Sequence, residues 1–408
     1  MPDFEEVNPQ RIGAAEIVVG IPSYNEAETL AHVVRVVDQG LQLHFREQAV
    51  AIINADNAST DGTRDVFLST ETGTPRIYLT TPQGVRGKGS NLLNLFARAR
   101  DLGAQAVAVV DSDLRSIEPR WVQKLVNPVL KGYDLVTPIY IRHKYDGTIT
   151  NNVAYPLVSA LFGRRIRQPI GGEFGFSKQL IDRLLSLPAS GPVRHFGIDI
   201  WLTTQACIQG MKICQSFMDA PKVHNPKDPG DGLDAMFRDV AGVLFTCMID
   251  HPDAWLTVET TKPSVMYGFG MGARRRPQAV TVNTGNLYRQ FTRAFATYRE
   301  DIEQVLAPRQ WNELRATLQK DPFDQKLSRE LWTRIVYDVA VAYSIDLLPR
   351  KRLLDLTLGL YKGKVLSDLL ELTEMGPWYA ERHVERLVDR FEREKPYLVE
   401  RWHQAHAG

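Results

Sequence analysis

The sequence has few cysteines and almost no net charge. It holds three cysteines in 408 residues, and Cys207, Cys214 and Cys247 do not form a Cys-x-x-Cys motif or any other metal-site spacing. This pattern predicts reduced, buried thiols in a cytosolic protein. The net charge of +1 gives no reason to expect a general binder of nucleic acids or of membrane surfaces.

Long apolar runs are also missing. No segment approaches the roughly 18 consecutive apolar residues that a membrane-spanning helix needs. The first ten residues, MPDFEEVNPQ, are acidic and lack the apolar stretch of a secretory signal. We therefore expect a cytoplasmic protein without a membrane span, which counts against membrane-embedded enzymes that act on lipid carriers.

Strand-like and helix-like segments alternate through the first third of the chain. Apolar runs rich in β-branched residues predict strands at 17–21, 50–54, 76–79, 106–110 and 135–141. Helical spacing predicts helices at 26–37, with Asn25 as its N-cap, and at 63–68 and 90–102. This alternation predicts an α/β fold, with a mostly parallel sheet covered by helices on both faces.

From residue 285 onward, strand signals almost vanish. Helices are predicted at 286–306, 309–319, 328–345, 351–360, 364–372 and 378–402. We therefore divide the chain into a sheet domain (1–265), a Gly- and Arg-rich loop or linker (266–284) and a C-terminal helical domain (285–408). The linker contains Arg274-Arg275-Arg276, which suits an anion-steering segment or a lid, whereas the earlier basic run at 164–167 suits a solvated face.

An acidic pair, Asp111 and Asp113, follows the predicted strand at 106–110. Ligands of α/β sheets bind at the carboxyl ends of the strands. Two carboxylates in an Asp-x-Asp spacing suit a hard divalent cation that keeps coordination sites for phosphate oxygens. Surface acidic pairs are common, so the weight of this motif comes from the motifs around it.

Three more loops lie beside predicted strands or helices. Pro22-Ser23-Tyr24-Asn25-Glu26 has groups that suit a nucleobase or ribose, or that simply cap a helix. The Asp56 carboxylate can accept hydrogen bonds from a uracil or guanine base, and the alternative is that it forms an Asx-turn. The stretch 84–90 contains Gly87-Lys88-Gly89 before a helix, where backbone amides and a lysine charge can meet a phosphate, although it lacks Walker spacing.

Later in the chain, three further candidates appear. Paired glycines at Gly171-Gly172 permit close backbone approach to a ligand, and Glu173 would then accept sugar or acceptor hydroxyls; a plain turn is the alternative. Asp199, at a predicted helix start, suits a cap, a sugar ligand or a base. His224 would complete a site made by two aspartates, or serve as a surface or capping residue.

Taken in order, these motifs resemble those of nucleotide-sugar glycosyltransferases of the GT-A fold, over residues 17 to about 245. The resemblance is greatest to the glucosyl-3-phosphoglycerate synthase and mannosylglycerate synthase families. The ordered motifs that carry it are Pro22-Ser23-Tyr24-Asn25-Glu26, Ser59-Thr60-Asp61, Gly87-Lys88-Gly89, Asp111-Ser112-Asp113, Pro169-Ile170-Gly171-Gly172-Glu173, Gly197-Ile198-Asp199 and His224.

The resemblance implies a metal-dependent hexosyl transfer, with mannose or glucose as the sugar and Mg²⁺ or Mn²⁺ as the cofactor. It places the cation on Asp111, Asp113 and His224, and it implies catalytic roles for Lys88, Glu173 and Asp199. The nucleotide-diphosphate sugar donor would contact Pro22, Tyr24, Asn25, Glu26, Asp56, Ser59, Gly87, Lys88 and Ser112. The small hydroxy-acid acceptor would contact Arg142, Thr148, Thr150, Gly171 and Gly172. By resemblance the reaction retains the anomeric configuration, while inversion stays open because Asp199 lies where inverting relatives place a general base.

The acceptor loop departs from the phosphoglycerate pattern. Those enzymes carry Gly-Arg-x-Thr, where this chain has Gly147-Thr148-Ile149-Thr150. We therefore expect D-glycerate or a similar acid rather than 3-phosphoglycerate, with Arg142 in place of the missing arginine. The alternatives are a glucosyl-3-phosphoglycerate synthase, a transferase acting on a lipid or polysaccharide acceptor, and a nucleotidyltransferase or nucleotide-sugar binding module. The last class is disfavoured because its Gly-rich loop is absent after the first strand. GDP-mannose and UDP-glucose both stay open as donors, and a homodimer stays open as the assembly.

Overall fold

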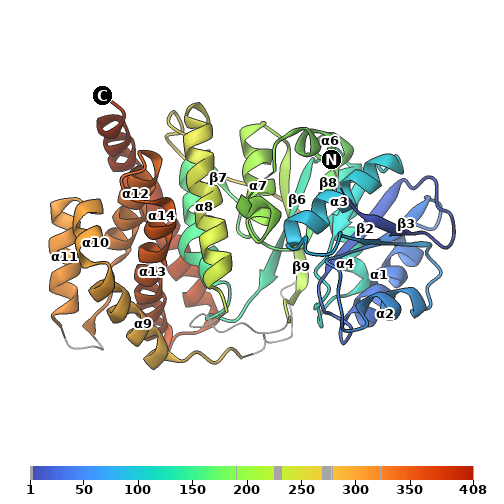
Figure 1. Ribbon diagram of the computed structural model, residues 1–408, viewed down its shortest axis with the longest axis horizontal. Helices are drawn as coiled ribbons and strands as arrows, with labels where there is room; N and C mark the ends of the chain where they lie inside the picture. The colour runs from blue at the N-terminus through green and yellow to red at the C-terminus, as the bar shows by residue number, and fades with distance from the viewer. Residues whose placement is uncertain are drawn as a thin grey trace. The chain divides into compact units, whose positions relative to one another are not determined.

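The computed structural model describes residues 3–189, 191–224, 232–268, 277, 279–320 and 324–407, and it forms two compact units (Figure 1). The α/β unit comprises the described residues of 1–142, 166–226 and 264–278, and the helical unit comprises those of 143–165, 227–263 and 279–408. The division differs from the predicted boundary at residue 265, because the segments 143–165 and 227–263 belong to the helical unit. Most of the predicted linker, including Arg274–Arg276, lies outside the described residues.

Across the described ranges, the α/β unit is built on a nine-stranded sheet with the order β1-β4-β3-β2-β5-β8-β6-β9-β11. The strands are β1 (Glu5–Val7), β2 (Ile17–Ser23), β3 (Val50–Asp56), β4 (Arg76–Thr80), β5 (Ala106–Val109), β6 (Leu135–Ile141), β8 (Phe174–Ser177), β9 (Ile213–Pro221) and β11 (Val265–Tyr267). Neighbours pair in parallel, except that β1 runs antiparallel to β4 and β8 runs antiparallel to β5 and β6. The predicted α/β fold with a mostly parallel sheet is confirmed.

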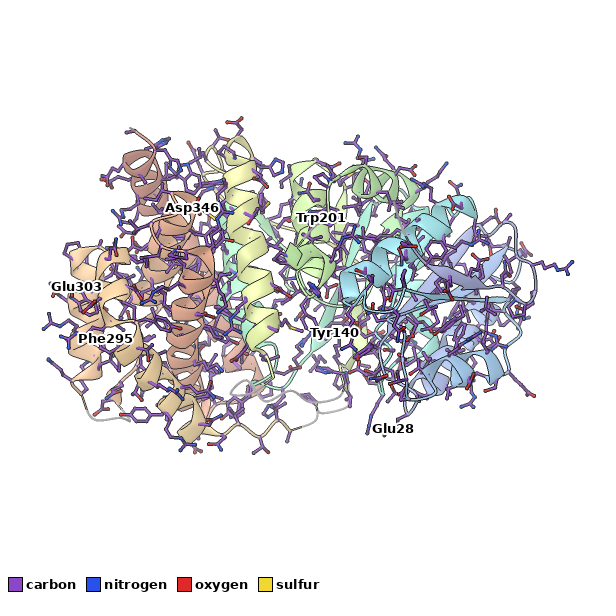
Figure 2. The ribbon with its side chains drawn as sticks, in the orientation of Figure 1. Glu28, Tyr140, Trp201, Phe295, Glu303 and Asp346 are labelled. Atoms are coloured by element: carbon purple, nitrogen blue, oxygen red, sulfur yellow. The ribbon has the colours of Figure 1, made fainter. Side chains whose placement is uncertain are left out.

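Helices cover both faces of this sheet (Figure 1). On one face lie α1 (Leu30–His44), α2 (Thr63–Ser69) and α4 (Pro119–Leu130), and on the other lie α3 (Lys88–Asp101), α6 (Lys178–Ser186) and α7 (Ile198–Ile208); a 3₁₀ turn, η2, spans Gly191–Arg194. Every residue of β2 is buried, as expected for a central strand with helices on both sides. Buried aromatic side chains such as Tyr140 of β6 and Trp201 of α7 fill the unit (Figure 2).

The turn after β2 differs from the prediction. Helix α1 begins at Leu30 rather than at Glu26, and Asn25 is not its N-cap. Asn25 has a φ of 55°, a left-handed conformation that asparagine tolerates better than most residues. Its side-chain oxygen accepts a hydrogen bond from the backbone N–H of Thr60 at 3.0 Å. The asparagine therefore joins two loops instead of capping a helix.

The helical unit confirms the predicted change to helices after residue 285. Its helices are η1 (Thr150–Ala154, a π-helix), α5 (Tyr155–Phe162), α8 (Asp234–Asp250), η3 (Pro252–Ala254), α9 (Thr284–Thr297), α10 (Arg299–Val305), α11 (Pro308–Leu318), α12 (Arg329–Ser344), α13 (Arg350–Leu372) and α14 (Pro377–Ala405). A short parallel pair joins β7 (Arg164–Arg165) to β10 (Lys262–Pro263). Helix α13 is continuous where the sequence predicts two helices. Gly363 lies within this helix and does not end it. The glycine instead allows close packing of α13 on α9, since a Cβ at this position would lie 2.6 Å from the Phe291 ring.

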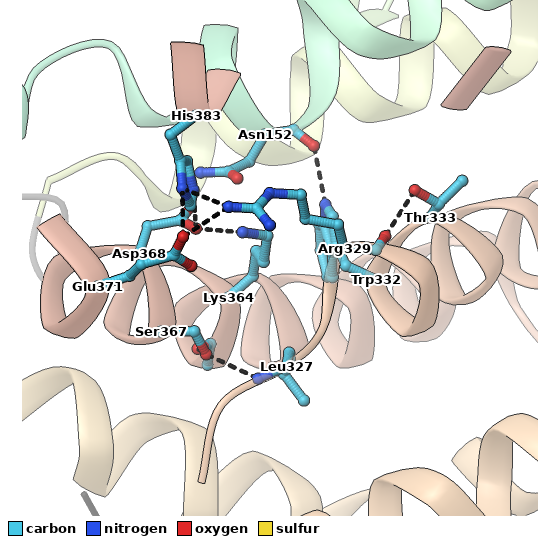
Figure 3. A network of polar contacts seen from close by, with 11 residues as sticks. Asn152, Leu327, Arg329, Trp332, Thr333, Lys364, Ser367, Asp368, Glu371 and His383 are labelled. Atoms are coloured by element: carbon cyan, nitrogen blue, oxygen red, sulfur yellow. Dashed lines mark hydrogen bonds and ion pairs between the residues drawn. The ribbon is translucent and has the colours of Figure 1, made fainter. Parts of the chain in front are cut away.

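A buried polar network joins three helices of this unit (Figure 3). His383 of α14 contacts Asp368 through Nε2 at 2.7 Å and Glu371 through Nδ1 at 3.1 Å. Lys364 pairs with Asp368, and Arg329 of α12 pairs with Glu371 at 2.6 Å. Each charged group of the network thus lies beside a group of opposite sign, which is what keeps buried charges tolerable.

The basic run at 164–167 does not form a solvated face. Arg165 contacts Glu385 at 3.1 Å, Asp389 at 2.6 Å and Glu392 at 3.2 Å. These three acids recur at helical spacing on α14, so they share one face of that helix. The sequence interpretation of this arginine was wrong because its partners lie more than 200 residues further along the chain.

Cys214 and Cys247 are buried, and Cys207 is partly exposed. The predicted burial of the thiols is therefore confirmed for two of the three. Among the described helices, none combines the length and apolarity that crossing a bilayer requires.

Candidate functional site

The candidate site lies at the carboxyl ends of the central parallel strands. In register, Ser23 at the end of β2 lies opposite Asp56 at the end of β3, and Gly20 lies opposite Val109 of β5. Because parallel strands end at one edge of a sheet, the loops that follow them meet there. The structure thus brings together the loop that begins at Pro22, the loop that follows Asp56 and the Asp-Ser-Asp motif at residues 111–113.

Hydrogen bonds join the loops after β2 and β3. The backbone N–H of Asn25 donates to Ser59 Oγ at 2.7 Å, and that of Glu26 donates to Thr63 Oγ1 at 2.9 Å. A third bond runs from the backbone N–H of Ala27 to the Asp61 carboxylate at 3.0 Å. Two of the predicted donor-binding loops therefore form one connected surface.

Asp56 is buried beneath these loops and accepts four hydrogen bonds. The donors are Ser23 Oγ at 2.8 Å, Ser59 Oγ at 2.6 Å, the Ser59 backbone N–H at 2.7 Å and the Tyr78 hydroxyl at 3.0 Å. A carboxylate has about four lone-pair positions, so protein donors already occupy those of Asp56. Its geometry is that of an anchor for both loops, and its direct contact with a base stays a prediction.

The remaining predicted donor residues differ in exposure. Pro22 and Ser112 are buried, while Tyr24 is 42% exposed and its ring lies 5.4 Å from the Arg86 guanidinium. Burial, followed by the negative charge of Asp113, raises the pKa of Glu26. The loops therefore offer an exposed aromatic ring beside a cation, next to a region of negative potential.

Lys88 bridges two carboxylates at the start of α3. Its Nζ lies 2.9 Å from Asp111 Oδ1 and 3.0 Å from Asp199 Oδ2. The preceding Gly87 has a φ of 119°, and a Cβ there would lie 2.2 Å from the backbone oxygen of Arg194, so only glycine fits. Burial opposes the charge of Lys88, but the two carboxylates outweigh it and raise the pKa of the lysine.

The sequence interpretation missed Lys222, which lies at the centre of the site. Its Nζ contacts Asp111 Oδ2 at 3.0 Å, both oxygens of Glu173 at 2.9 and 3.0 Å, and the Gly171 carbonyl oxygen at 2.8 Å. A single lysine after a strand matches no motif. The one local signal is that it lies two positions before His224.

The paired glycines allow the loop to reach Asp111. A Cβ on Gly172 would lie 2.3 Å from Asp111 Oδ2, and a Cβ on Gly171 would lie 2.6 Å from the Pro138 ring. Gly172 also has a φ of 88°, which favours glycine. The glycine pair was predicted to let the backbone approach a ligand closely. In the structure, Gly172 closely approaches the Asp111 carboxylate instead.

The carboxylates of the site have shifted pKa values. Burial would raise the pKa of Asp111, but Lys88 and Lys222 reverse this effect and hold it well below its ordinary value. Burial raises the pKa of Glu173 and of Asp199, against the opposing effect of the lysines. Among the described residues, Asp199 Oδ1 is a buried oxygen without a hydrogen-bond partner. Buried polar atoms nearly always have a hydrogen-bond partner, and the hydroxyl group of a bound ligand could donate to this oxygen.

The expected cation ligands are only partly brought together. Within the described residues, no group of three or more His, Cys, Asp or Glu side chains is arranged to hold a metal ion, and both oxygens of Asp111 contact lysines. The loop that follows Asp113 is nevertheless tied to the residue before His224. The Arg115 N–H donates to the Val223 oxygen, and the Val223 N–H donates to Ser116 Oγ, both at 2.9 Å. A cation held by Asp113 and His224, with its remaining ligands from a diphosphate, stays a prediction.

The predicted acceptor residues fall in both units. In the α/β unit, the Arg142 guanidinium and Lys222 Nζ each lie 5.3 Å from the Tyr140 ring centroid. In the helical unit, the hydroxyl of the buried Thr148 lies 2.6 Å from that of Tyr361, and Thr150 is buried at the start of η1. Arg142 therefore lies near the charged cluster, while acceptor contacts of the two threonines stay a prediction.

Comparison with known proteins agrees with this geometry. Residues 18–183 match the model of glycosyl transferase family 2. A glucosyl-3-phosphoglycerate synthase of Mycolicibacterium smegmatis is 30% identical over 191 residues, which are 43% of this chain and 60% of that protein. The glycosyltransferase AglJ of Haloferax volcanii is 26% identical over 234 residues, covering 55% of this chain and 68% of that protein.

One solved structure illustrates the extent of the similarity. Glucosyl-3-phosphoglycerate synthase of Mycobacterium tuberculosis, in complex with Mn²⁺, uridine diphosphate and glucosyl-3-phosphoglycerate, is 28% identical with a TM-score of 0.46, over 57% of this chain and 79% of that one. The chain thus spans 60% of the length of the M. smegmatis relative. Strand β3, Lys88 and the Asp-Ser-Asp motif lie within residues 18–183, the segment that matches the glycosyl transferase family 2 model, while Asp199, Lys222 and His224 lie beyond it.

Proposed function

We propose that this chain is a glycosyltransferase that moves a hexose from a nucleotide-diphosphate sugar to a small hydroxy acid of the glycerate type. The observation that carries the proposal is the bridge from Lys88 to Asp111 and Asp199. A lysine in the first turn of a helix, preceded by a glycine and placed beside an acidic pair, suits a diphosphate and its cation. The family 2 match over residues 18–183, which include Lys88 and Asp111, supports the class of reaction.

The cofactor in this proposal is Mg²⁺ or Mn²⁺, held by Asp113 and His224. The chemistry it supplies when bound is Lewis-acid assistance to the departing nucleotide diphosphate. Lys88 adds a positive charge beside the diphosphate. Asp199 Oδ1, which lacks a partner among the described residues, accepts a hydrogen bond from a substrate hydroxyl. We assign retention of configuration; inversion would instead require Asp199 to take the proton of the acceptor hydroxyl.

The acceptor in this proposal is D-glycerate, bound through its carboxylate by Arg142. The Arg142 guanidinium lies 5.3 Å from the Tyr140 ring, beside the charged cluster, and would supply the positive charge for the carboxylate. A second candidate is 3-phosphoglycerate, because the M. smegmatis relative is named for that acceptor. Against it stands Thr148, at the position where the phosphoglycerate pattern has an arginine, since a dianion without a partner is costly to desolvate.

Nucleotide release tests this function. Purified protein is incubated with UDP-glucose or GDP-mannose and Mg²⁺ or Mn²⁺, with and without D-glycerate, and the released nucleotide diphosphate is measured. We expect release that depends on the acceptor and is lost in Lys88→Ala. A protein that binds the donor but releases the nucleotide equally with and without any hydroxy acid would contradict the proposal.

A further inference from the structure

The ammonium group of Lys222 lies inside a cage of four oxygen atoms. Two belong to Glu173, one to Asp111 and one to the Gly171 backbone, at distances of 2.8 to 3.0 Å. The lysine is only 8% exposed. An ammonium group has three N–H donors, so the cage uses all its hydrogen-bonding capacity. Lys222 therefore faces the protein and leaves no donor for a substrate.

Glu173 serves this lysine rather than a substrate. It is completely buried, and both its oxygens lie within 3.0 Å of Lys222 Nζ. A buried charge is tolerated when a partner of opposite sign and further hydrogen bonds satisfy it. The geometry thus gives Glu173 the role of counter-ion, in place of the sugar- or acceptor-binding role predicted from the sequence.

Lys222 also orients Asp111. One oxygen of that carboxylate contacts Lys222 and the other contacts Lys88, so the two lysines hold the carboxylate from both sides. Gly172 packs so closely against Asp111 Oδ2 that a Cβ there would lie 2.3 Å away. The position of Lys88, the residue expected beside the diphosphate, therefore depends on a carboxylate that Lys222 fixes.

We propose that Lys222 is a positioning residue of the donor site. With Glu173 as its counter-ion, it fastens the Gly171–Glu173 loop to Asp111 and so holds Asp111 and Lys88 where they receive the nucleotide diphosphate. This inference rests on the proposed function, and it adds a buried ion pair, outside the Asp-Ser-Asp motif, on which donor affinity depends.

Three variants and one control test this role. Lys222→Met removes the ammonium group, Glu173→Gln removes the counter-ion with little change in shape, and a double variant removes both. The matched control is Lys124→Met, because Lys124 also pairs with a carboxylate in the same unit, that of Asp219, and donates to the Phe217 oxygen, and neither partner belongs to the cluster. For each variant we measure the melting temperature, the Kd for UDP and GDP with Mg²⁺ by calorimetry, and the KM for both substrates.

Lys222→Met leaves Glu173 buried without its cation, and Glu173→Gln leaves Lys222 with Asp111 as its remaining carboxylate, so we expect the melting temperature of each to fall, by roughly 5 °C or more for Lys222→Met. The double variant removes both charges and should recover much of this loss. Nucleotide affinity should behave differently: Lys222→Met and the double variant should both bind the diphosphate about tenfold more weakly, because Asp111 and Lys88 are no longer fixed. The acceptor KM should stay within about twofold, and the control should match the wild type in affinity.

The outcomes separate this inference from the proposed function. If the double variant recovers both stability and nucleotide affinity, Lys222 is only half of a structural ion pair and the inference is overturned. Unchanged nucleotide affinity in a folded Lys222→Met variant also overturns it, while transfer by the wild type still supports the proposed function. If the wild type binds the nucleotide but transfers to no hydroxy acid, the proposed acceptor is wrong, and weaker nucleotide binding by Lys222→Met still supports the positioning role.

Discussion

Each unit of this protein contains a buried cluster of basic side chains and carboxylates, and the two clusters differ in the pKa values of their acids. In the helical unit, Lys364 and His383 outweigh the effect of burial and lower the pKa of Asp368 to about 2. The pKa of Glu371 is also lowered, because the effects of His383 and Arg329 outweigh that of burial. In the α/β unit, Lys88 and Lys222 outweigh burial at Asp111 and hold its pKa well below the ordinary value, but burial raises the pKa of Glu173 and Asp199 in spite of the same lysines.

This difference fits a structural cluster in the helical unit and supports the functional role that we propose for the cluster in the α/β unit. The helical cluster joins α12, α13 and α14, and its acids are stabilised as anions by protein partners (Figure 3). The α/β cluster lies at the ligand edge of the sheet and, within the described residues, leaves Asp199 Oδ1 without a partner. Perturbed acids with unmet hydrogen-bonding capacity are typical of functional sites. Both clusters thus contain an acid with a lowered pKa, Asp111 in one and Asp368 in the other, and the α/β cluster differs in its two acids with raised pKa values.

The largest expected effect is on the cation ligands of the α/β unit. Asp113→Ala and His224→Ala should each lower turnover at least ~100-fold, because each removes charge stabilisation of the leaving diphosphate. Turnover is measured at saturating Mg²⁺ or Mn²⁺, with Asp182→Ala, an exposed acid of α6, as the control. Near-wild-type turnover in both variants would refute this cation site.

Donor binding should depend on the α/β cluster and not on the helical one. Lys88→Ala and Asp56→Ala should weaken nucleotide-diphosphate binding roughly ten- to hundredfold, since Lys88 supplies a charge-assisted contact and Asp56 anchors both donor loops. Calorimetry with UDP and GDP measures this, with Asp368→Asn as the comparison from the helical unit. If Lys88→Ala and Asp56→Ala leave the affinity unchanged, these loops are only turns and caps.

The helical cluster should instead show in the pH dependence of stability. The pKa of Asp368 falls from 3.8 to about 2 on folding, so its ionised form stabilises the folded state by about 2 kcal/mol at neutral pH. This contribution is present above pH ~4 and is lost as the pH falls toward 2. Urea unfolding of the wild type and Asp368→Asn should therefore differ at pH 7 and converge near pH 2. An equal difference at both pH values would contradict this account of the cluster.

The smallest predicted effect concerns the acceptor. Arg142→Ala should raise the KM for D-glycerate about tenfold, the scale of one lost charge-assisted contact, with little change in the donor KM. The wild type should prefer D-glycerate to 3-phosphoglycerate in kcat/KM. If 3-phosphoglycerate is the much better acceptor, the interpretation of Thr148 is wrong, and Arg274–Arg276 become the next residues to test for a phosphate site.

The sequence predicted the strands that end at the site, because each is a continuous apolar run followed by polar residues. It also predicted that Lys88, Asp111 and Asp199 belong to one site, through the order of the motifs. It did not predict β8, a four-residue strand inserted antiparallel between β5 and β6, since a stretch this short carries little periodic signal. Lys222 was missed because its partners lie 49 and 111 positions away in the chain, so no local pattern marks it.

The central claim is that the charged cluster of the α/β unit carries out hexosyl transfer to a small hydroxy acid. Its most direct test is product mass in a donor-by-acceptor matrix, with UDP-glucose and GDP-mannose against D-glycerate and 3-phosphoglycerate, in the presence of Mg²⁺ or Mn²⁺. We predict a hexosyl-glycerate product that the wild type makes and Lys88→Ala does not. The account would be contradicted if wild-type protein that binds the nucleotide forms no hexosylated product with either acid.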